Sequence, residues 1–217
     1  TINLVRGPYL QVLTPNSVNI RWASDISTNS KVYYGTDLSY GSAVDSATIT
    51  TEHEIKLTGL LPNTKYYYTV GSSLKNIQGD DKNYFTTSLT TGSNASFTVW
   101  ATGDFGKITT GQAGVKSAYL NYGKRANFWI WLGDNAYESG TTAEYNSTVF
   151  NQYPDIFKKT PVYPAPGNHD YANAGYLSVS ALGTNFPYFN FFTVPTQAQA
   201  GGVASNSKKY YSYDFGN

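Results

Sequence analysis

Three short polar clusters, each led by a glycine, are the parts of this sequence that could do chemistry. They are Gly103-Asp104-Phe105-Gly106, Gly133-Asp134-Asn135-Ala136-Tyr137 and Gly167-Asn168-His169-Asp170. Their carboxylate, amide and phenol oxygens with one imidazole form a hard ligand set that suits Fe, Mn, Zn or Mg. Taken singly, Gly-Asp is most often a turn, and His169 could be a turn histidine bonded to its neighbours. The joint pattern favours a metal site.

Each cluster directly follows an apolar run, and helix-like stretches separate the runs. The runs are FTVWAT, NFWIWL and PVYPAP, and the stretches between them are TGQAGVKSAYLNYGK and TAEYNSTVFNQYPDIFKK. Apolar strands alternating with helices predict βαβ units and a parallel sheet covered on both faces. The carboxyl ends of parallel strands meet at one edge of a sheet. We therefore expect the three clusters to converge on one crevice.

The first 90 residues have a different pattern, in which short alternating strands are separated by turn residues. This pattern, from Pro8 to about Thr87, predicts an all-β sandwich, with Trp22 as the core anchor. Tyr66, at the start of a predicted strand, is placed to bond back to the preceding corner. His53 lies in TTEHEIKL and is assigned to the surface of a strand rather than to a metal site.

The segment SLTTGSNA, residues 88–95, separates the two patterns and marks a domain boundary. We assign residues 1–90 to the sandwich, which resembles a fibronectin type III module, and residues 91–217 to an α/β domain.

Composition excludes several classes of partner. Only 13% of the residues are charged and the net charge is +1, so no basic field for nucleic acid and no polybasic run for a membrane surface is present. No apolar run approaches the ~18 residues that span a bilayer. The neutral polar composition, and a sequence that begins at Thr1, favour a secreted or periplasmic protein.

The three clusters resemble the GDxG, GDxxY and GNH[DE] blocks of the calcineurin-like metallophosphoesterases. Tyr137, together with the preceding sandwich, is similar to the purple acid phosphatases. The resemblance implies that residues 91–217 form the first half of a metallophosphoesterase domain, with a mixed sheet, βαβ units and helices on its faces. It also implies a binuclear metal-dependent acid phosphatase that hydrolyses small phosphomonoesters.

The resemblance also implies a role for each matching residue. Asp104 would bind the first metal, Asp134 would bridge both, and Asn168 would bind the second. Tyr137 would bind the first metal as a tyrosinate on ferric iron, so the implied pair is Fe with Zn, Mn or Fe.

The resemblance implies a catalytic role for the third cluster. His169 would stand near the phosphate, as a proton donor to the leaving group or a stabiliser of the transition state, and Asp170 would orient it.

Two further family blocks, of the VxxH and GHxH types, are missing from these 217 residues. Only Asp134 and Asn168 then remain for the second metal, so we expect the segment alone not to be a competent phosphatase. The chain would continue past Asn217, or a second copy or complementing C-terminal segment would supply the rest, or activity has been lost. The alternative function is a non-catalytic interaction module. The aromatics of residues 177–209 would either pack that segment or contact the substrate.

Overall fold

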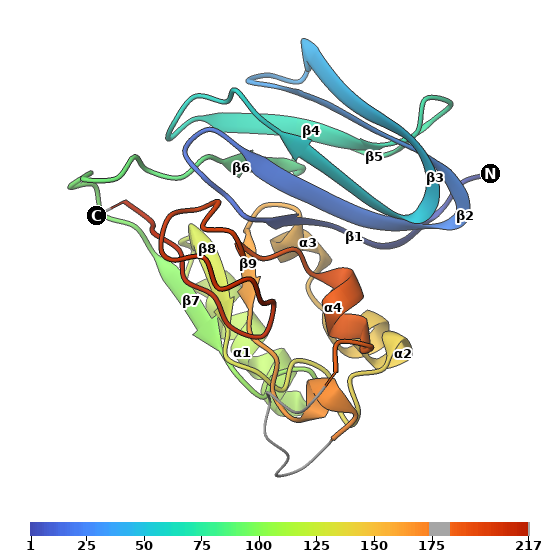
Figure 1. Cartoon of the computed structure of the whole chain (residues 1–217), viewed down its shortest axis with the longest axis vertical. Coiled ribbons are helices and arrows are strands. Elements are labelled where there is room, and N and C mark those ends of the chain that lie inside the picture. Colours follow the sequence, from blue (N-terminus) through green and yellow to red (C-terminus); the bar gives the residue numbers. More distant parts are fainter. Residues whose placement is uncertain (174–182, 217) are drawn as a thin grey trace.

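The computed structural model describes residues 1–173 and 183–216 as two packed parts (Figure 1). An antiparallel sheet contains β1 (Leu4–Gln11), β2 (Val18–Gly35), β3 (Ser42–Leu57), β4 (Lys65–Gly71), β5 (Asn76–Gln78) and β6 (Tyr84–Thr86). The first half of the long strand β2 lies between β1 and β3, and its second half lies between β3 and β4. The sheet therefore bends around its own core.

The sandwich core forms where the alternating pattern predicts it. Trp22 is fully buried, as expected. The hydroxyl of Tyr66 accepts a hydrogen bond of 3.0 Å from the backbone N–H of Leu61, which is the predicted bond back to the corner. This bond fixes the entry into β4.

The surface position expected for His53 is wrong, because the residue is fully buried. Its ring stacks on Trp22, with ring centroids 4.9 Å apart. Its Nε2 lies 2.7 Å from the hydroxyl of Ser24, and its Nδ1 lies 2.8 Å from that of Ser30. The pattern held the signal, since His53 is in phase with the buried Ile55 and out of phase with its exposed glutamate neighbours.

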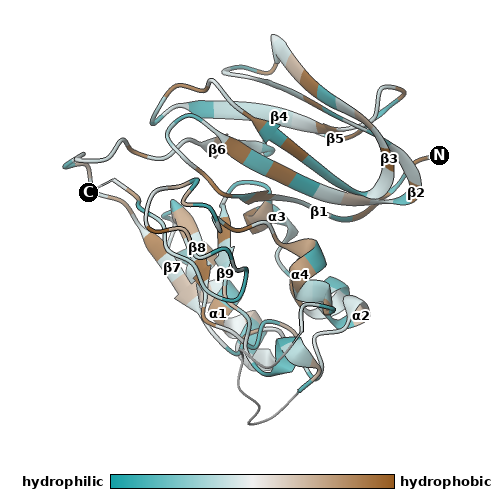
Figure 2. Ribbon diagram, viewed as in Figure 1, coloured by the Kyte–Doolittle hydropathy of each residue, from teal (hydrophilic) through white to brown (hydrophobic). Residues whose placement is uncertain are grey.

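The second part is a parallel sheet in the order β7-β8-β9, followed and covered by helices. Its elements are β7 (Val99–Thr102), α1 (Thr110–Asn121), β8 (Phe128–Trp131), α2 (Thr142–Glu144), the π-helix η1 (Tyr145–Phe150), α3 (Pro154–Phe157), β9 (Val162–Pro164), the 3₁₀-helix η2 (His169–Tyr171) and α4 (Pro187–Phe191). Figure 2 shows the apolar character of these three strands. This is the predicted alternation of strands and helices.

The two faces of this sheet are covered differently. Trp100 and Trp129 stack 4.2 Å apart on one face, and aromatic side chains of α1, η1, α3 and α4 pack there. On the other face, Tyr163 stacks on Tyr213 at 4.0 Å, and Phe128 packs against Phe215. Among the described residues, helices therefore cover one face and the C-terminal segment covers part of the other.

The aromatics of the segment that precedes residue 210 pack inward where the structure describes them. Tyr188, Phe189, Phe191 and Phe192 are buried in the core beside the helices. The packing interpretation therefore holds for these residues, whereas residues 177–182 lie outside the described part.

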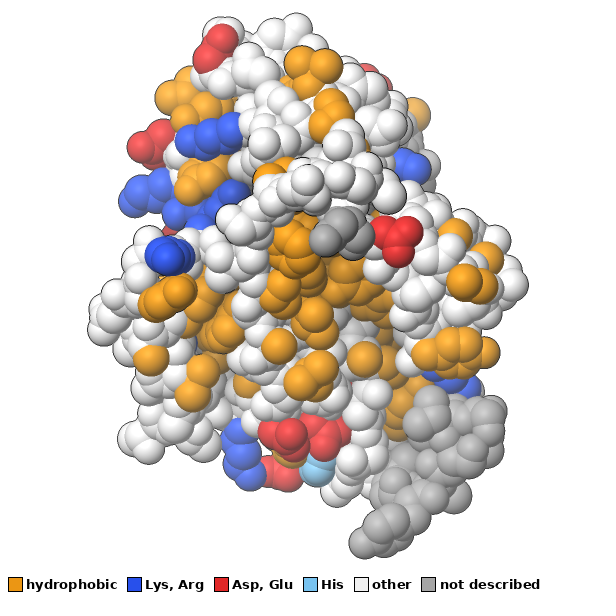
Figure 3. Space-filling view, turned by 90° about the vertical axis from the view of Figure 1, so that its left-hand side faces the viewer, with side chains coloured by type: hydrophobic (Ala, Val, Ile, Leu, Met, Phe, Trp, Pro, Cys, Tyr) orange, Lys and Arg blue, Asp and Glu red, His pale blue; other side chains and the backbone are white. Residues whose placement is uncertain are grey.

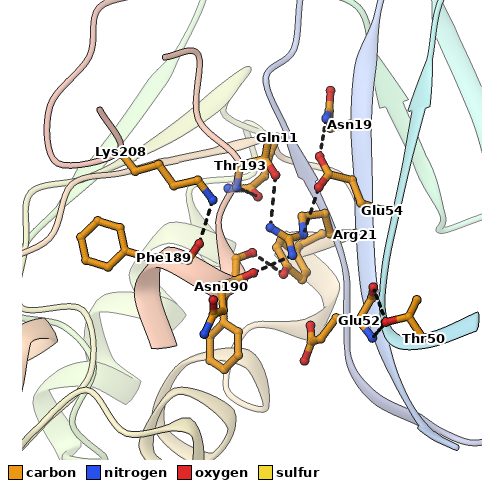
Figure 4. Close-up of polar contacts among 12 residues, drawn as sticks. Gln11, Asn19, Arg21, Thr50, Glu52, Glu54, Phe189, Asn190, Thr193 and Lys208 are labelled. Carbon is orange, nitrogen blue, oxygen red and sulfur yellow. Dashed lines mark hydrogen bonds and ion pairs between the residues drawn. The ribbon is translucent and has the colours of Figure 1, made fainter. Parts of the chain in front are cut away.

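Side chains of the sandwich hold α4 through polar contacts (Figure 4). Arg21 donates to the carbonyl of Asn190 at 2.7 Å and to the hydroxyl of Thr193 at 3.1 Å. Gln11 accepts from the backbone N–H of Thr193 at 2.8 Å. Arg6 lies over the ring of Phe191, 3.7 Å from its centroid. The two parts are therefore joined by oriented, partly buried bonds.

None of the helices in residues 1–173 and 183–216 combines the length and the apolar character that a bilayer crossing requires.

The buried His53 predicts a pH dependence of stability. Burial, opposed by the charge of Glu52, lowers the pKa of His53 below its usual 6.5. Below about pH 6.5 His53 is protonated in the unfolded chain but stays neutral in the folded chain. The free energy of unfolding should therefore fall as the pH drops below about 6.5. His53→Gln should flatten this dependence of the thermal midpoint between pH 7.5 and pH 5. Equal slopes in both proteins would contradict this account.

Candidate metal centre

Hydrogen bonds connect the three polar clusters at the carboxyl ends of β7, β8 and β9. The N–H of Asp104 donates to the carbonyl of Gly133 at 3.2 Å, and the N–H of Tyr137 donates to the carbonyl of Gly106 at 2.9 Å. The N–H of His169 donates to Oδ1 of Asp134 at 2.9 Å. The structure thus brings the clusters together at one edge of the sheet, where parallel sheets bind ligands.

Two glycines permit this close approach. A Cβ at Gly106 would lie 1.7 Å from the carbonyl oxygen of Asn135, and one at Gly167 would lie 2.1 Å from Oδ1 of Asp134. No side chain fits at either distance. The glycines of the clusters therefore let neighbouring loops touch, in addition to turning the chain.

The carboxylates of Asp104 and Asp134 share one phenol. The hydroxyl of Tyr137 donates to Oδ1 of Asp104 at 2.6 Å and reaches Oδ2 of Asp134 at 3.4 Å. Both aspartates have left-handed backbones, with φ of 54° and 51°, which L-residues adopt rarely and which cluster at functional sites. Three hard oxygen donors therefore meet at one point, and such a set fits a cation such as Fe, Mn or Zn.

The charge around Tyr137 is strongly negative. Burial and then the carboxylates of Asp104 and Asp134 raise the pKa of Tyr137 well above its usual value of 10. A phenol in this place keeps its proton and donates it to the aspartates. A bound cation would reverse this preference, because it favours the anionic form of every oxygen around it.

His169 is held at one ring nitrogen. Its Nδ1 lies 2.5 Å from the backbone carbonyl of Glu138, and its ring lies 4.3 Å from that of Tyr137. A carbonyl only accepts, so Nδ1 carries a proton and donates it. Among the described residues, the hydrogen bond of this ring is therefore made at Nδ1.

Asp170 was expected to orient His169, but its side chain bonds to other groups. It is fully buried, and it accepts hydrogen bonds from the backbone N–H of Gly167 at 2.8 Å, from the N–H and side-chain amide of Asn135 at 3.1 Å each, and from the hydroxyl of Tyr145. The carbonyl of Glu138, not this carboxylate, orients His169. Asp170 instead joins the second cluster to the third.

A helix cap fixes the loop that carries Glu138. Glu144 accepts from the N–H groups of Glu138 at 2.5 Å, Ser139 at 3.1 Å and Thr141 at 2.9 Å. Thr141 and Glu144 form a capping box at the start of α2. Burial acts to raise the pKa of Glu144, but these bonds outweigh it and lower the pKa. The T-x-x-E spacing was a readable signal that the sequence analysis missed.

Asn168 belongs to the third cluster, but its side chain makes no hydrogen bond to Asp104 or Asp134 among the described residues. It is exposed, and its side-chain amide donates to Asn173 at 3.2 Å. Across residues 1–173 and 183–216, no three His, Asp or Glu side chains are grouped to hold a metal ion. The described residues therefore fit one metal through Asp104, Asp134 and Tyr137, and they supply less to a second.

Sequence comparisons agree with this architecture. Residues 97–216 match the calcineurin-like phosphoesterase model, and residues 6–87 match the purple acid phosphatase N-terminal domain. The chain belongs to the calcineurin-like phosphoesterase family. Membership of this family implies a dimetal centre. No curated protein sequence matches it.

Solved structures show the same fold for this phosphoesterase. The purple acid phosphatase PPD1 from yellow lupin (Lupinus luteus) seeds is 18% identical, with a TM-score of 0.72, over 96% of this chain and 42% of that one. PhoD is 15% identical, with a TM-score of 0.65, over 96% of this chain and 49% of that one. The phosphoesterase chain therefore spans less than half the length of either protein.

Substituting a contact glycine should disrupt the centre, whereas substituting a free one should not. Gly167→Ala would drive a methyl group into Asp134, so we expect a loss of about 2–4 kcal/mol in the free energy of unfolding. Gly114→Ala is the matched control: it lies in α1 with open space around it, and it should gain about 0.5–1 kcal/mol. Denaturant unfolding measures both. Equal effects would contradict the close contact between the loops.

Proposed function

We propose that this chain contributes the first part of a binuclear metal centre that hydrolyses phosphomonoesters, as an acid phosphatase does. The observation that carries the proposal is the meeting of Asp104 and Asp134 on the single phenol oxygen of Tyr137. Two neighbouring carboxylates repel each other, and a cation bound between them would offset this repulsion.

The oxygen donors would divide between two metals. Asp104 and Tyr137 would hold the first, Asp134 would bridge the pair, and Asn168 would contribute to the second. The tyrosinate favours ferric iron in the first position, with Zn, Mn or Fe in the second. Such a pair supplies Lewis acidity and an activated water for in-line displacement at phosphorus.

His169 would serve as the general acid. The carbonyl of Glu138 holds Nδ1 at 2.5 Å, and Nε2 would then act on a ligand held at the carboxylates. A protonated Nε2 could donate to the leaving oxygen as the phosphoester bond breaks. A cavity of about 480 Å³ beside Asp104 and Tyr137, lined also by Phe105 and Lys107, gives room for the organic group.

The remaining metal ligands would come from outside the described residues. A further segment or a second copy of the chain would supply them, because this chain spans only 42% and 49% of the two similar structures. We also propose a secreted or periplasmic location.

An interaction module without activity is the second candidate, and the exposure of apolar residues favours it. Val99, which begins β7, is 39% exposed, and Leu132, which directly follows β8, is 66% exposed. Figure 3 shows hydrophobic side chains across this face, above a group of acidic side chains and a histidine. Exposed apolar surfaces of this kind often bind another protein.

Metal content and turnover decide between the two candidates. Protein of measured intact mass is analysed for metals and assayed with p-nitrophenyl phosphate. In protein whose intact mass exceeds the 23.8 kDa of these 217 residues, we expect two metals and turnover. Asp134→Asn should reduce that turnover at least about a hundredfold, because metal stabilisation is worth several kcal/mol. Asp45→Asn, an exposed carboxylate on β3, is the control and should change neither. Metal-free, inactive wild-type protein would favour the interaction module.

A further inference from the structure

We propose that the junction between the sandwich and the phosphoesterase part holds a second anion site, which takes a ligand with several phosphate groups. A cavity of about 210 Å³ lies there, lined by Tyr84, Tyr119, Lys124, Arg125 and Lys159 among others. Arg125 and Lys159 each precede a strand of the parallel sheet by three residues. The cavity is therefore at the opposite end of the sheet from the carboxylates of the metal centre.

Lys124, Arg125 and Lys159 line this cavity, and Lys65 lies beside it over the ring of Tyr84. Around the ring of Tyr84, the Nζ of Lys65 is 4.0 Å from the centroid, the Cζ of Arg125 is 5.2 Å and the Nζ of Lys159 is 5.6 Å. Lys124 lines the same cavity. In the part of the chain that the structure describes, every ion pair within 4.0 Å involves other cations than these four.

The one acidic residue that lines the cavity, Asp155, also interacts with Lys159 and offsets only part of this charge. Asp155 forms an ion pair with Lys158 at 3.0 Å. The four remaining cations repel one another, and a bound anion would offset that repulsion. Figure 3 shows Lys and Arg side chains gathered on one side of the molecule, at the level where the two parts meet. The net charge of +1 conceals this local excess.

The shape and donors of the cavity select the ligand. It is smaller than the roughly 300 Å³ at which sites for drug-sized ligands begin, so it would hold one phosphate group, and further groups of the same chain would lie against the lysines around it. Arg125 uses donors on the carbonyl of Lys159 at 3.0 Å and on the hydroxyl of Thr86 at 3.1 Å. Its other N–H groups and the lysine ammonium groups suit phosphate oxygens. Four cations exceed the charge of one phosphate, which favours a chain of phosphates.

The aromatic rings here are not free to stack on nucleic acid bases. The ring of Tyr84 is in contact with the three cations and with Tyr67, and the ring of Tyr119 stacks on Trp100 at 4.1 Å. Binding of single strands depends on such stacking. A condensed phosphate chain, which needs only charge and hydrogen bonds, fits the site better than a polynucleotide does.

Titration calorimetry with sodium tripolyphosphate tests the site. The chain is stripped of metal and carries Asp134→Asn, so that the result does not depend on the proposed phosphatase centre. We expect tripolyphosphate to bind, with an affinity that falls as salt is raised, and orthophosphate to bind at least about tenfold more weakly. Single-stranded DNA is titrated in parallel and should bind more weakly than tripolyphosphate.

Two charge-matched double variants locate the binding. Lys124→Gln with Lys159→Gln should weaken tripolyphosphate at least about tenfold, because each lost charge-assisted contact alone accounts for about that factor. Lys56→Gln with Lys75→Gln, two exposed lysines of the sandwich, removes the same charge elsewhere and should weaken it less than about threefold. Thermal unfolding verifies that both variants fold. Arg125→Lys keeps the charge but removes the planar guanidinium fork, and it should also weaken the binding of tripolyphosphate. Absence of tripolyphosphate binding, equal losses in the two pairs, or tighter binding of DNA would overturn the proposal.

Discussion

A buried carboxylate is the constraint on which the candidate centre depends. Asp170 is removed from water, and burial raises its pKa, against hydrogen bonds from Tyr145, Gly167 and Asn135. A buried charge without such donors would be costly. The donors belong to separate segments of the chain, so satisfying the carboxylate brings the second and third clusters together.

The same carboxylate connects the centre to the sandwich. Tyr145, which donates to Asp170, packs edge-on against Phe191 with ring centroids 5.5 Å apart. Phe191 lies under Arg6, and its carbonyl accepts from the hydroxyl of Tyr9 at 2.6 Å. Packed aromatic rings and oriented polar bonds therefore run from β1 to the loops of the centre. The sandwich therefore holds α4 in place, and Phe191 of α4 packs against Tyr145, the donor to Asp170.

Much of this architecture was predictable because it depends on periodicity and chain order. The alternating strands around Trp22, the alternation of strands and helices after residue 96, and the meeting of Asp104 with Asp134 all follow from local patterns. His53 was misplaced because it was assigned to the exposed phase of the alternating strand, whereas it shares the phase of the buried Ile55. Two serines satisfy its ring nitrogens inside the core.

The sequence could not supply contacts that depend on how loops pack in space. The partners of Asp170 are backbone groups, the side-chain amide of Asn135 and a tyrosine 25 residues away, and no spacing rule encodes them. The gathering of Lys65 with Arg125 and Lys159 is equally hidden, because the three are distant in sequence and the net charge averages them with the rest of the chain.

The 18-residue strand β2 has a mechanical consequence for the molecule. It pairs with β1, β3 and β4 in turn, and its Arg21 holds α4. No neighbouring strand can peel away without breaking a ladder that includes β2. Loss of this strand would release the whole sandwich and the support of α4 in one event, so the two parts should melt as a single cooperative unit.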